Sequence, residues 1–189
     1  ERHRRTDRSL IETAERLTVV MDSINALIYV ADLETYEILF TNAYGRNIWG
    51  DITGKICWQT LQEGQTGPCP FCTNSKLLDA EGNPTGVYAW EFQNTVTGRW
   101  FDCRDQAIRW HDGRQVRIEI ATDITIRKEA LQSLAANEAQ LRTLVETIPD
   151  LVWLKDENGV YLTCNRMFAR FFGASEAEIV GKSDYDFVD

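Results

Sequence analysis

The chain has 189 residues, 43% of them hydrophobic and 11% aromatic, a composition that supports a packed core and excludes a disordered tail. Its formal net charge of -9 argues against a nucleic-acid partner and against docking on anionic lipid, because both need a basic surface. No apolar run reaches the roughly 18 residues that cross a bilayer, so we expect no membrane segment here, while the parent protein can still be membrane-anchored. The five cysteines are too sparse for a disulfide scaffold and predict a reducing, cytoplasmic compartment.

Residues 1–24 are predicted to form a helix with a narrow apolar seam. Its seam residues step by four and three positions in turn: Leu10, Ala14, Leu17, Met21 and Ile24. This heptad spacing favours pairing with the same helix of a second copy, since a narrow seam suits a partner helix better than a core. The alternative, an amphipathic helix lying on its own domain, stays open at this point.

Residues 25–125 are predicted to form one α+β domain. Hairpin signals and period-2 alternation indicate five strands, at residues 26–32, 36–41, 86–94, 99–110 and 114–122. Short helical pieces separated by glycines occupy the stretch after the second strand, and a further helix is predicted over 71–80. This order gives a five-stranded antiparallel sheet with short helices on one face.

Residues 126–147 are predicted to form a helical connector with a second coiled-coil seam. The apolar seam residues of this stretch are Ile124, Leu131, Leu134, Leu141, Val145 and Ile148. Two polar residues, Arg127 and Glu138, interrupt the seam. Such residues weaken a coiled coil and help to set its register.

After the connector, the pattern of the first domain starts again. Leu27, Asp32 and Asn42 recur at nearly equal spacing as Leu151, Asp156 and Asn165. A repeat of this period indicates tandem domains. We therefore expect a second, incomplete domain over 148–189, which stops before counterparts of the last three strands.

The arrangement resembles the PAS family. In the first copy the resemblance rests on Tyr29 to Asp32 (YVAD), Thr41-Asn42, Gly54-Lys55, His111 to Arg114 (HDGR) and Asp123 to Lys128 (DITIRK). In the second copy it rests on Asp156 to Gly159 (DENG), Asn165 and Glu178 to Lys182 (EIVGK). The DITIRK segment is similar to the signature where PAS strands join an output helix. The resemblance therefore implies that Asp123, Thr125 and Arg127 transmit a signal.

The resemblance also implies a function. PAS domains are sensory and dimerisation modules of bacterial signalling proteins, such as histidine kinases of two-component systems and GGDEF diguanylate cyclases. Neither output domain is visible in the sequence, and no catalytic constellation emerges, so we predict no enzymatic activity for this chain. We expect a homodimer formed through the helices, with a small-molecule ligand as a candidate partner.

The most unusual local feature is the CxxC pair of Cys69 and Cys72. The pair stands at the start of the helix predicted over 71–80, where backbone N–H groups would lower a thiol pKa, and we therefore predict Cys69 to be the most reactive thiol. With Cys57 and Cys103, the pair is a candidate metal or redox site. The alternative is that these are small buried residues in a tight turn.

Aromatic side chains suggest a pocket between the sheet and the helices. The candidate pocket residues are Trp58, Trp90, Phe92, Trp100, Phe101 and Arg104. Core packing is the alternative for the aromatic residues, and a solvated sheet face is the alternative for Arg104.

The cofactor stays unknown at this point. Haem is disfavoured because His3 lies in the charged leading segment and His111 lies in a hairpin turn, so neither is placed as an axial ligand. Gly54 to Cys57 (GKIC) resembles the GRNC motif of flavin-binding light sensors, but the following residues and the later strands depart from that pattern. Two functions remain: a sensory PAS module, and a thiol or metal redox protein that uses Cys69 and Cys72.

Overall fold

The computed structural model describes residues 2–187, and the side chains of residues 12–187. The chain divides into two compact units, residues 1–128 and residues 129–189. The seam residue Leu10 and His3 lie outside the described side chains, so what the sequence predicts for them stays a prediction.

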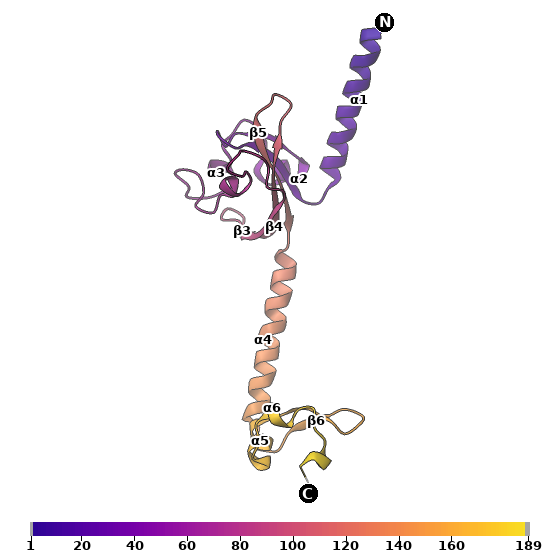
Figure 1. Ribbon diagram of the computed structural model, residues 1–189, viewed down its shortest axis with the longest axis vertical. Coiled ribbons are helices and arrows are strands. Elements are labelled where there is room, and N and C mark those ends of the chain that lie inside the picture. Colours follow the sequence, from indigo (N-terminus) through magenta and orange to yellow (C-terminus); the bar gives the residue numbers. More distant parts are fainter. Residues whose placement is uncertain (1, 188–189) are drawn as a thin grey trace. The chain divides into compact units, whose positions relative to one another are not determined.

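The first unit is built on a five-stranded antiparallel sheet (Figure 1). Its strands are β1 (Leu27–Asp32), β2 (Ile38–Thr41), β3 (Tyr88–Gln93), β4 (Trp100–Arg109) and β5 (Gln115–Asp123). They lie in the order β2-β1-β5-β4-β3, so the long stretch between β2 and β3 carries the chain from one edge of the sheet to the other. The five predicted strands are confirmed, with small differences at their ends.

Short helices cover one face of this sheet, as predicted. They are α2 (Ala43–Trp49), α3 (Cys57–Thr60) and the 3-10 helix η1 (Asn74–Lys76). The odd-numbered residues of β1 pack with Ile52, Cys57 and Leu61 in one buried core cluster. Because neighbouring residues of a strand point to opposite faces, this packing shows which alternate residues of the strands face the helical layer.

The helix predicted over 71–80 is wrong. A bond from the Cys72 backbone N–H to the Cys69 carbonyl (2.9 Å) closes a turn, and only η1 follows. The side chains of this segment bond to the sheet region instead: the Thr73 hydroxyl donates to Asp105, and the Asn74 amide donates to the Leu33 carbonyl. Such tertiary bonds hold the backbone in a loop despite its helical pattern.

Two long helices are present where the sequence predicts them. They are α1 (Arg2–Ser23) and α4 (Thr125–Thr147). No residue of α4 is buried. Among the described residues, no helix combines the length and apolar character needed to cross a membrane.

The second unit contains a two-stranded hairpin and short helices. Its elements are β6 (Trp153–Lys155), β7 (Tyr161–Cys164), α5 (Arg166–Phe172), α6 (Glu176–Ile179) and the 3-10 helix η2 (Asp184–Asp186). A small core of Tyr161, Cys164, Phe168 and Ile179 lies between them.

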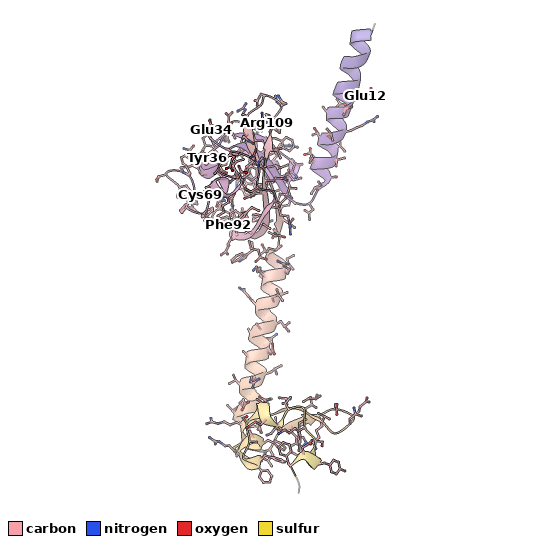
Figure 2. The ribbon with its side chains drawn as sticks, in the orientation of Figure 1. Glu12, Glu34, Tyr36, Cys69, Phe92 and Arg109 are labelled. Atoms are coloured by element: carbon pink, nitrogen blue, oxygen red, sulfur yellow. The ribbon has the colours of Figure 1, made fainter. Side chains whose placement is uncertain are left out.

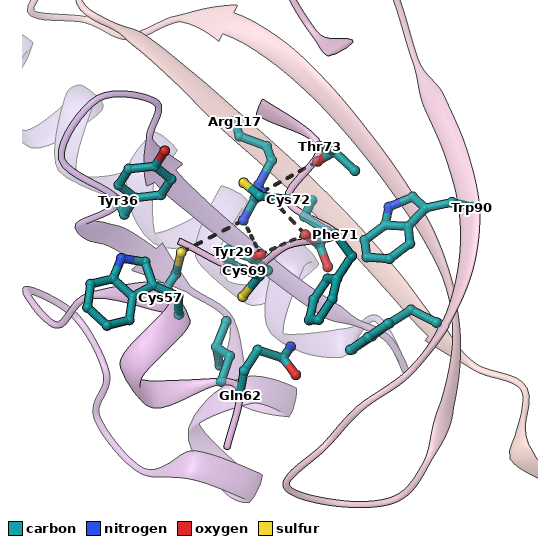
Figure 3. A pocket seen from close by; sticks show the side chains of 14 residues that line it. Tyr29, Tyr36, Cys57, Gln62, Cys69, Phe71, Cys72, Thr73, Trp90 and Arg117 are labelled. Atoms are coloured by element: carbon teal, nitrogen blue, oxygen red, sulfur yellow. Dashed lines mark hydrogen bonds and ion pairs between the residues drawn. The ribbon is translucent and has the colours of Figure 1, made fainter. Parts of the chain in front are cut away.

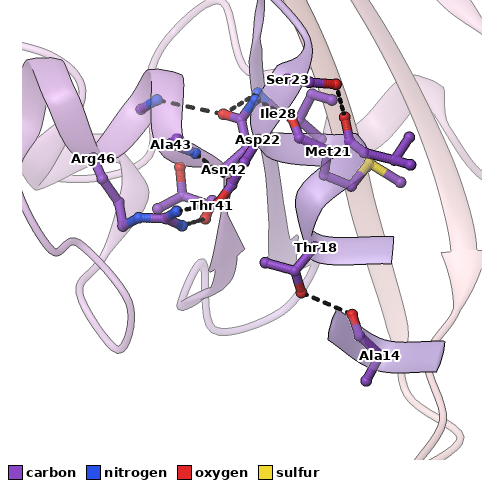
Figure 4. A network of polar contacts seen from close by, with 12 residues as sticks. Ala14, Thr18, Met21, Asp22, Ser23, Ile28, Thr41, Asn42, Ala43 and Arg46 are labelled. Carbon is purple, nitrogen blue, oxygen red and sulfur yellow. Dashed lines mark hydrogen bonds and ion pairs between the residues drawn. The ribbon is translucent and has the colours of Figure 1, made fainter. Parts of the chain in front are cut away.

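A single buried asparagine organises the start of the first unit (Figure 4). The Asn42 side-chain oxygen accepts from the backbone N–H groups of Ile28 (3.0 Å) and Gly45 (3.3 Å), so it links β1 to the first turn of α2. Its amide nitrogen donates to the carbonyls of Met21 (3.0 Å) and Ala26 (2.9 Å). Asn42 thus connects the end of α1, the first strand and α2.

The repeated asparagine makes the same contacts in the second unit. The Asn165 side-chain oxygen accepts from the N–H groups of Val152 (3.1 Å) and Phe168 (3.0 Å). Its amide nitrogen donates to the carbonyls of Val145, Ile148 and Asp150. Both asparagines are fully buried. The repeat seen in the sequence is therefore a repeated junction between a preceding helix, a strand and a following helix.

Gly45 of α2 offers a direct test of packing at this junction. A Cβ atom there would lie 2.2 Å from Thr41 Oγ1 and 2.7 Å from Leu27 Cδ1, both on buried residues. We expect Gly45→Ala to destabilise the first unit by about 1–3 kcal/mol, because overpacking outweighs the gain in helix propensity. Thermal denaturation measures the effect. Gly67→Ala is the control, since nothing lies within 4 Å of its added Cβ; equal stability of the two variants would contradict the expected crowding.

Candidate functional site

A cavity lies between the sheet and its helical layer in the first unit (Figure 3). Its volume is about 40 Å³, enough for about two or three water molecules. The lining residues come from β1, β3, β5, α3 and the neighbouring loops: Tyr29, Tyr36, Cys57, Trp58, Leu61, Gln62, Cys69, Phe71, Cys72, Thr73, Trp90, Phe92, Arg117 and Glu119. Tyr36, Cys69 and Phe92 lie along the same side of this unit in Figure 2.

A buried guanidinium group forms the polar wall of the cavity. Arg117 of β5 is only 6% exposed. One of its terminal nitrogens, Nη2, donates to the Tyr29 hydroxyl (2.6 Å), and the other, Nη1, donates to Asn74 Oδ1 (3.0 Å). The same nitrogens lie 4.0 Å from the Cys57 sulfur and 3.8 Å from the Cys72 sulfur. Arg117 therefore ties β1, α3 and the CxxC loop to the middle of the sheet.

Two buried carboxyl groups lie beside this guanidinium. Glu119 Oε2 is 3.7 Å from Arg117 Nε and accepts from the Tyr29 hydroxyl (2.6 Å). Asp105 of β4 is paired directly with Glu119 across the strands, and its Oδ2 accepts from the indole N–H of Trp90 (2.9 Å). Burial and the nearby charge of Asp105 raise the pKa of Glu119 to about 7.

The thiols of the cavity are not activated in the way the sequence suggests. Cys69 lies in a turn rather than at a helix N-terminus, and burial raises its pKa to about 11. Burial also raises the pKa of Cys57. Both thiols are therefore protonated at neutral pH, and the reason for predicting Cys69 as the most reactive thiol is removed.

The four cysteines predicted as a metal or redox site do not form one cluster. Cys57, Cys69 and Cys72 line the cavity, whereas Cys103 of β4 lines a second cavity of about 30 Å³. Among the side chains of residues 12–187, no group of three or more His, Cys, Asp or Glu is placed to hold a metal ion. All five cysteines are free thiols.

The predicted pocket residues divide between the two faces of the sheet. Trp58, Trp90 and Phe92 line the cavity, and Phe101 is buried next to the second cavity. The placement of Trp100 and Arg104 in the pocket is wrong. Neither lines either cavity, and both alternate with the inward-facing residues of β4, so the pleat directs them to the other face.

The sequence interpretation missed Arg117 and Glu119. The period-2 alternation that predicts the strand at 114–122 is carried by Val116, Ile118 and Ile120, and these residues lie on the opposite face of β5. The strand pairing could have indicated them, because β5 lies between β1 and β4. Its Glu119 is the cross-strand partner of both Tyr29 and Asp105.

The residues predicted to transmit a signal lie where β5 leads into α4. Asp123 Oδ1 accepts from the Thr125 backbone N–H (2.9 Å), and its Oδ2 pairs with Arg99 (3.1 Å). The Thr125 hydroxyl oxygen accepts from the Trp100 N–H (3.0 Å), so the first residue of α4 is bonded to the first residue of β4. Arg127 pairs with Glu91 of β3 (2.7 Å).

Comparisons with known proteins agree with the family resemblance. The PAS fold family model matches residues 139–189. Sensor protein FixL of Bradyrhizobium diazoefficiens is 31% identical over 87 residues, which are 46% of this chain and 17% of FixL. The chain therefore spans less than one fifth of that relative.

Solved structures show weaker likenesses. The PAS domain of an HTR-like protein from Haloarcula marismortui is 18% identical, with a TM-score of 0.44, covering 64% of this chain and 99% of that one. An RNA-binding light-oxygen-voltage receptor is 20% identical, with a TM-score of 0.47, covering 67% of this chain and 37% of that one. Residues 139–189 thus match the PAS fold family, and the chain is similar to part of a sensor protein.

Proposed function

We propose that this chain is the sensory and dimerisation region of a signalling protein, and that this region lies in the cytoplasm. A small molecule that binds in the cavity of the first unit would shift the strands of the sheet. Helix α4 would transmit this shift to an output domain, either a histidine kinase or a diguanylate cyclase. The FixL relative, which is named a sensor protein, supports the sensory role.

The observation that best supports signal transmission is that neighbouring residues of β3 contact the cavity on one side and α4 on the other. Trp90 and Phe92 line the cavity. Glu91, between them, points to the opposite face and pairs with Arg127 and Lys128 in the first turn of α4. Any shift of Trp90 or Phe92 by a ligand therefore reaches a residue that holds the helix.

A ligand can use this path only by binding two arrangements with different affinity. Removing both cations of the Glu91 contact would release α4 from β3 without altering the cavity lining. The contact is exposed, so its contribution to stability is small, and its role is to couple two elements rather than to hold the fold.

The surface of α4 supports dimerisation. Its apolar seam residues lie 37–64% exposed in the single chain: Leu131, Leu134, Leu141 and Val145. An apolar heptad stripe that stays exposed in the single chain is typical of a helix that forms a coiled coil with a second helix. The seam position Arg127 is occupied in another way, because its guanidinium pairs with Glu91. The proposed seam therefore begins after the first turn.

Sedimentation equilibrium tests the proposed dimer. We expect the wild-type chain to dimerise and Leu141→Glu to raise the dimer dissociation constant by on the order of 100-fold, because each of two Leu side chains loses about 1.5 kcal/mol or more of burial. Ile126→Glu is the matched control. Ile126 is also on α4 and 83% exposed, but it lies outside the heptad positions. A monomeric wild type, or equal weakening by both variants, would refute dimerisation through this seam.

A further inference from the structure

Asp105 and Glu119 form a buried pair of acidic side chains that the proposed ligand site does not require. They are directly opposite each other on the antiparallel strands β4 and β5, and both face the helical layer. Asp105 is 0% exposed and Glu119 is 8% exposed. Opposite residues of such strands have Cβ atoms about 4.5–5.5 Å apart, and like charges at that distance repel strongly in a dry interior.

The hydrogen bonds of the pair leave one place for a proton. Asp105 Oδ2 is saturated, accepting from the Thr73 hydroxyl (2.5 Å) and the Trp90 indole (2.9 Å). Asp105 Oδ1 is buried and has no hydrogen-bond partner. Glu119 accepts the Tyr29 hydroxyl on Oε2. This buried carboxylate oxygen lacks a hydrogen-bond partner and lies beside a second carboxyl group. It gains a hydrogen bond if one proton is held between the two groups.

The charges around the pair also favour one proton on the two carboxyl groups. From β5, Arg117 is the one cation that faces it among the described residues. The other facing groups are neutral donors or thiols: Tyr29 of β1, Cys57 of α3, Thr73 of the loop before η1, Trp90 of β3 and Cys103 of β4. One guanidinium balances one carboxylate. The second carboxyl group has no counter-ion and is most stable when protonated.

We infer that Asp105 and Glu119 share one proton, and that this pair is a proton-binding site whose deprotonation loosens the wall of the cavity. The burial that places the pKa of Glu119 at about 7 puts the change near neutrality. Arg117 is the link to the wall, because it donates to Asn74 and contacts Cys72 of the CxxC loop. A second negative charge attracts its guanidinium toward Glu119 and weakens those contacts.

The Trp90 indole N–H reports on this proton because it bonds to Asp105. We expect its NMR resonance in the 189-residue chain to move through a single inflection near pH 7 in a titration from about pH 5 to pH 9. In Glu119→Gln, whose amide replaces the shared proton with a permanent donor, the inflection should disappear. Asp102→Asn, a partly exposed carboxylate of the same strand β4, should keep it.

Infrared difference spectra of the wild type give a second readout that needs no variant. A carboxylic-acid C=O band should be present at low pH and be lost over the same range. The proton-sharing pair is overturned if the wild-type Trp90 resonance and the carboxylic-acid band are both independent of pH over this range. It is also overturned if Glu119→Gln folds and retains the inflection.

Discussion

Replacement of Asn42 by Ala is expected to destabilise the first unit by about 3–5 kcal/mol. The substitution removes two acceptor and two donor contacts, to Ile28, Gly45, Met21 and Ala26, at a fully buried position. Each orphaned backbone group costs about 1–3 kcal/mol, less where the loosened helix end lets water in. Urea denaturation followed by tryptophan fluorescence measures the loss, since Trp153 is the only one of the six tryptophans in the second unit.

Asn83→Ala is the matched control for this substitution. Asn83 is exposed in a turn, and its side-chain amide contacts only Asp79 at 3.2 Å among the described contacts. Its loss should change the unfolding free energy by no more than about 0.5 kcal/mol. Asn165→Ala should destabilise the second unit and leave most of the fluorescence transition in place. Equal midpoints for Asn42→Ala and Asn83→Ala would show that the junction does not hold the unit together.

The sheet was predictable from the sequence because its signals are local. Asp112-Gly113 marks one hairpin, and Thr97-Gly98 marks another; both glycines adopt the positive φ that these turns require. The recurrence of Asn42 as Asn165 was also visible, since a side chain that binds four backbone groups has no substitute of the same shape. What the sequence could not show was which face of each strand the helices cover.

That choice of face explains the errors in the site. Both faces of β5 carry a regular pattern, one of Val116, Ile118 and Ile120 and one of Arg117, Glu119 and Ala121. Hydrophobicity alone selects the first as the core, but the second faces the cavity. The burial of Arg117 depends on partners from distant strands and loops, such as Tyr29 and Asn74, and no local pattern encodes such partners.

The helix predicted over 71–80 failed for a related reason. Thr73 and Asn74 form their main side-chain bonds with Asp105, Arg117 and Leu33, which are far away in the sequence. Those hydrogen bonds require the loop geometry, and the loop partly buries Cys69 where a helix N-terminus was expected. One change in local structure thus reversed the expected direction of the thiol pKa.

Replacement of Arg117 by Met is expected to cost the first unit about 3–5 kcal/mol at neutral pH and above. Met fills a similar volume but leaves Glu119 and Asp105 buried without their cation, and removing one partner of a buried ion pair has a cost of this size. The loss should be smaller in mild acid. The raised pKa of Glu119 means that the folded state binds a proton which the unfolded chain has already released, so stability falls as the pH rises toward about 7.

Arg104→Met is the control for this last substitution. Arg104 lies on the neighbouring strand β4, but its side chain is 58% exposed and pairs only with Asp102 at 3.4 Å among the described contacts. Its replacement should change the unfolding free energy by about 0.5 kcal/mol or less at any pH. Urea denaturation of both variants at about pH 5 and pH 8 separates the effects. If Arg117→Met matched Arg104→Met at both pH values, the guanidinium would not be what makes two buried carboxyl groups tolerable in this core.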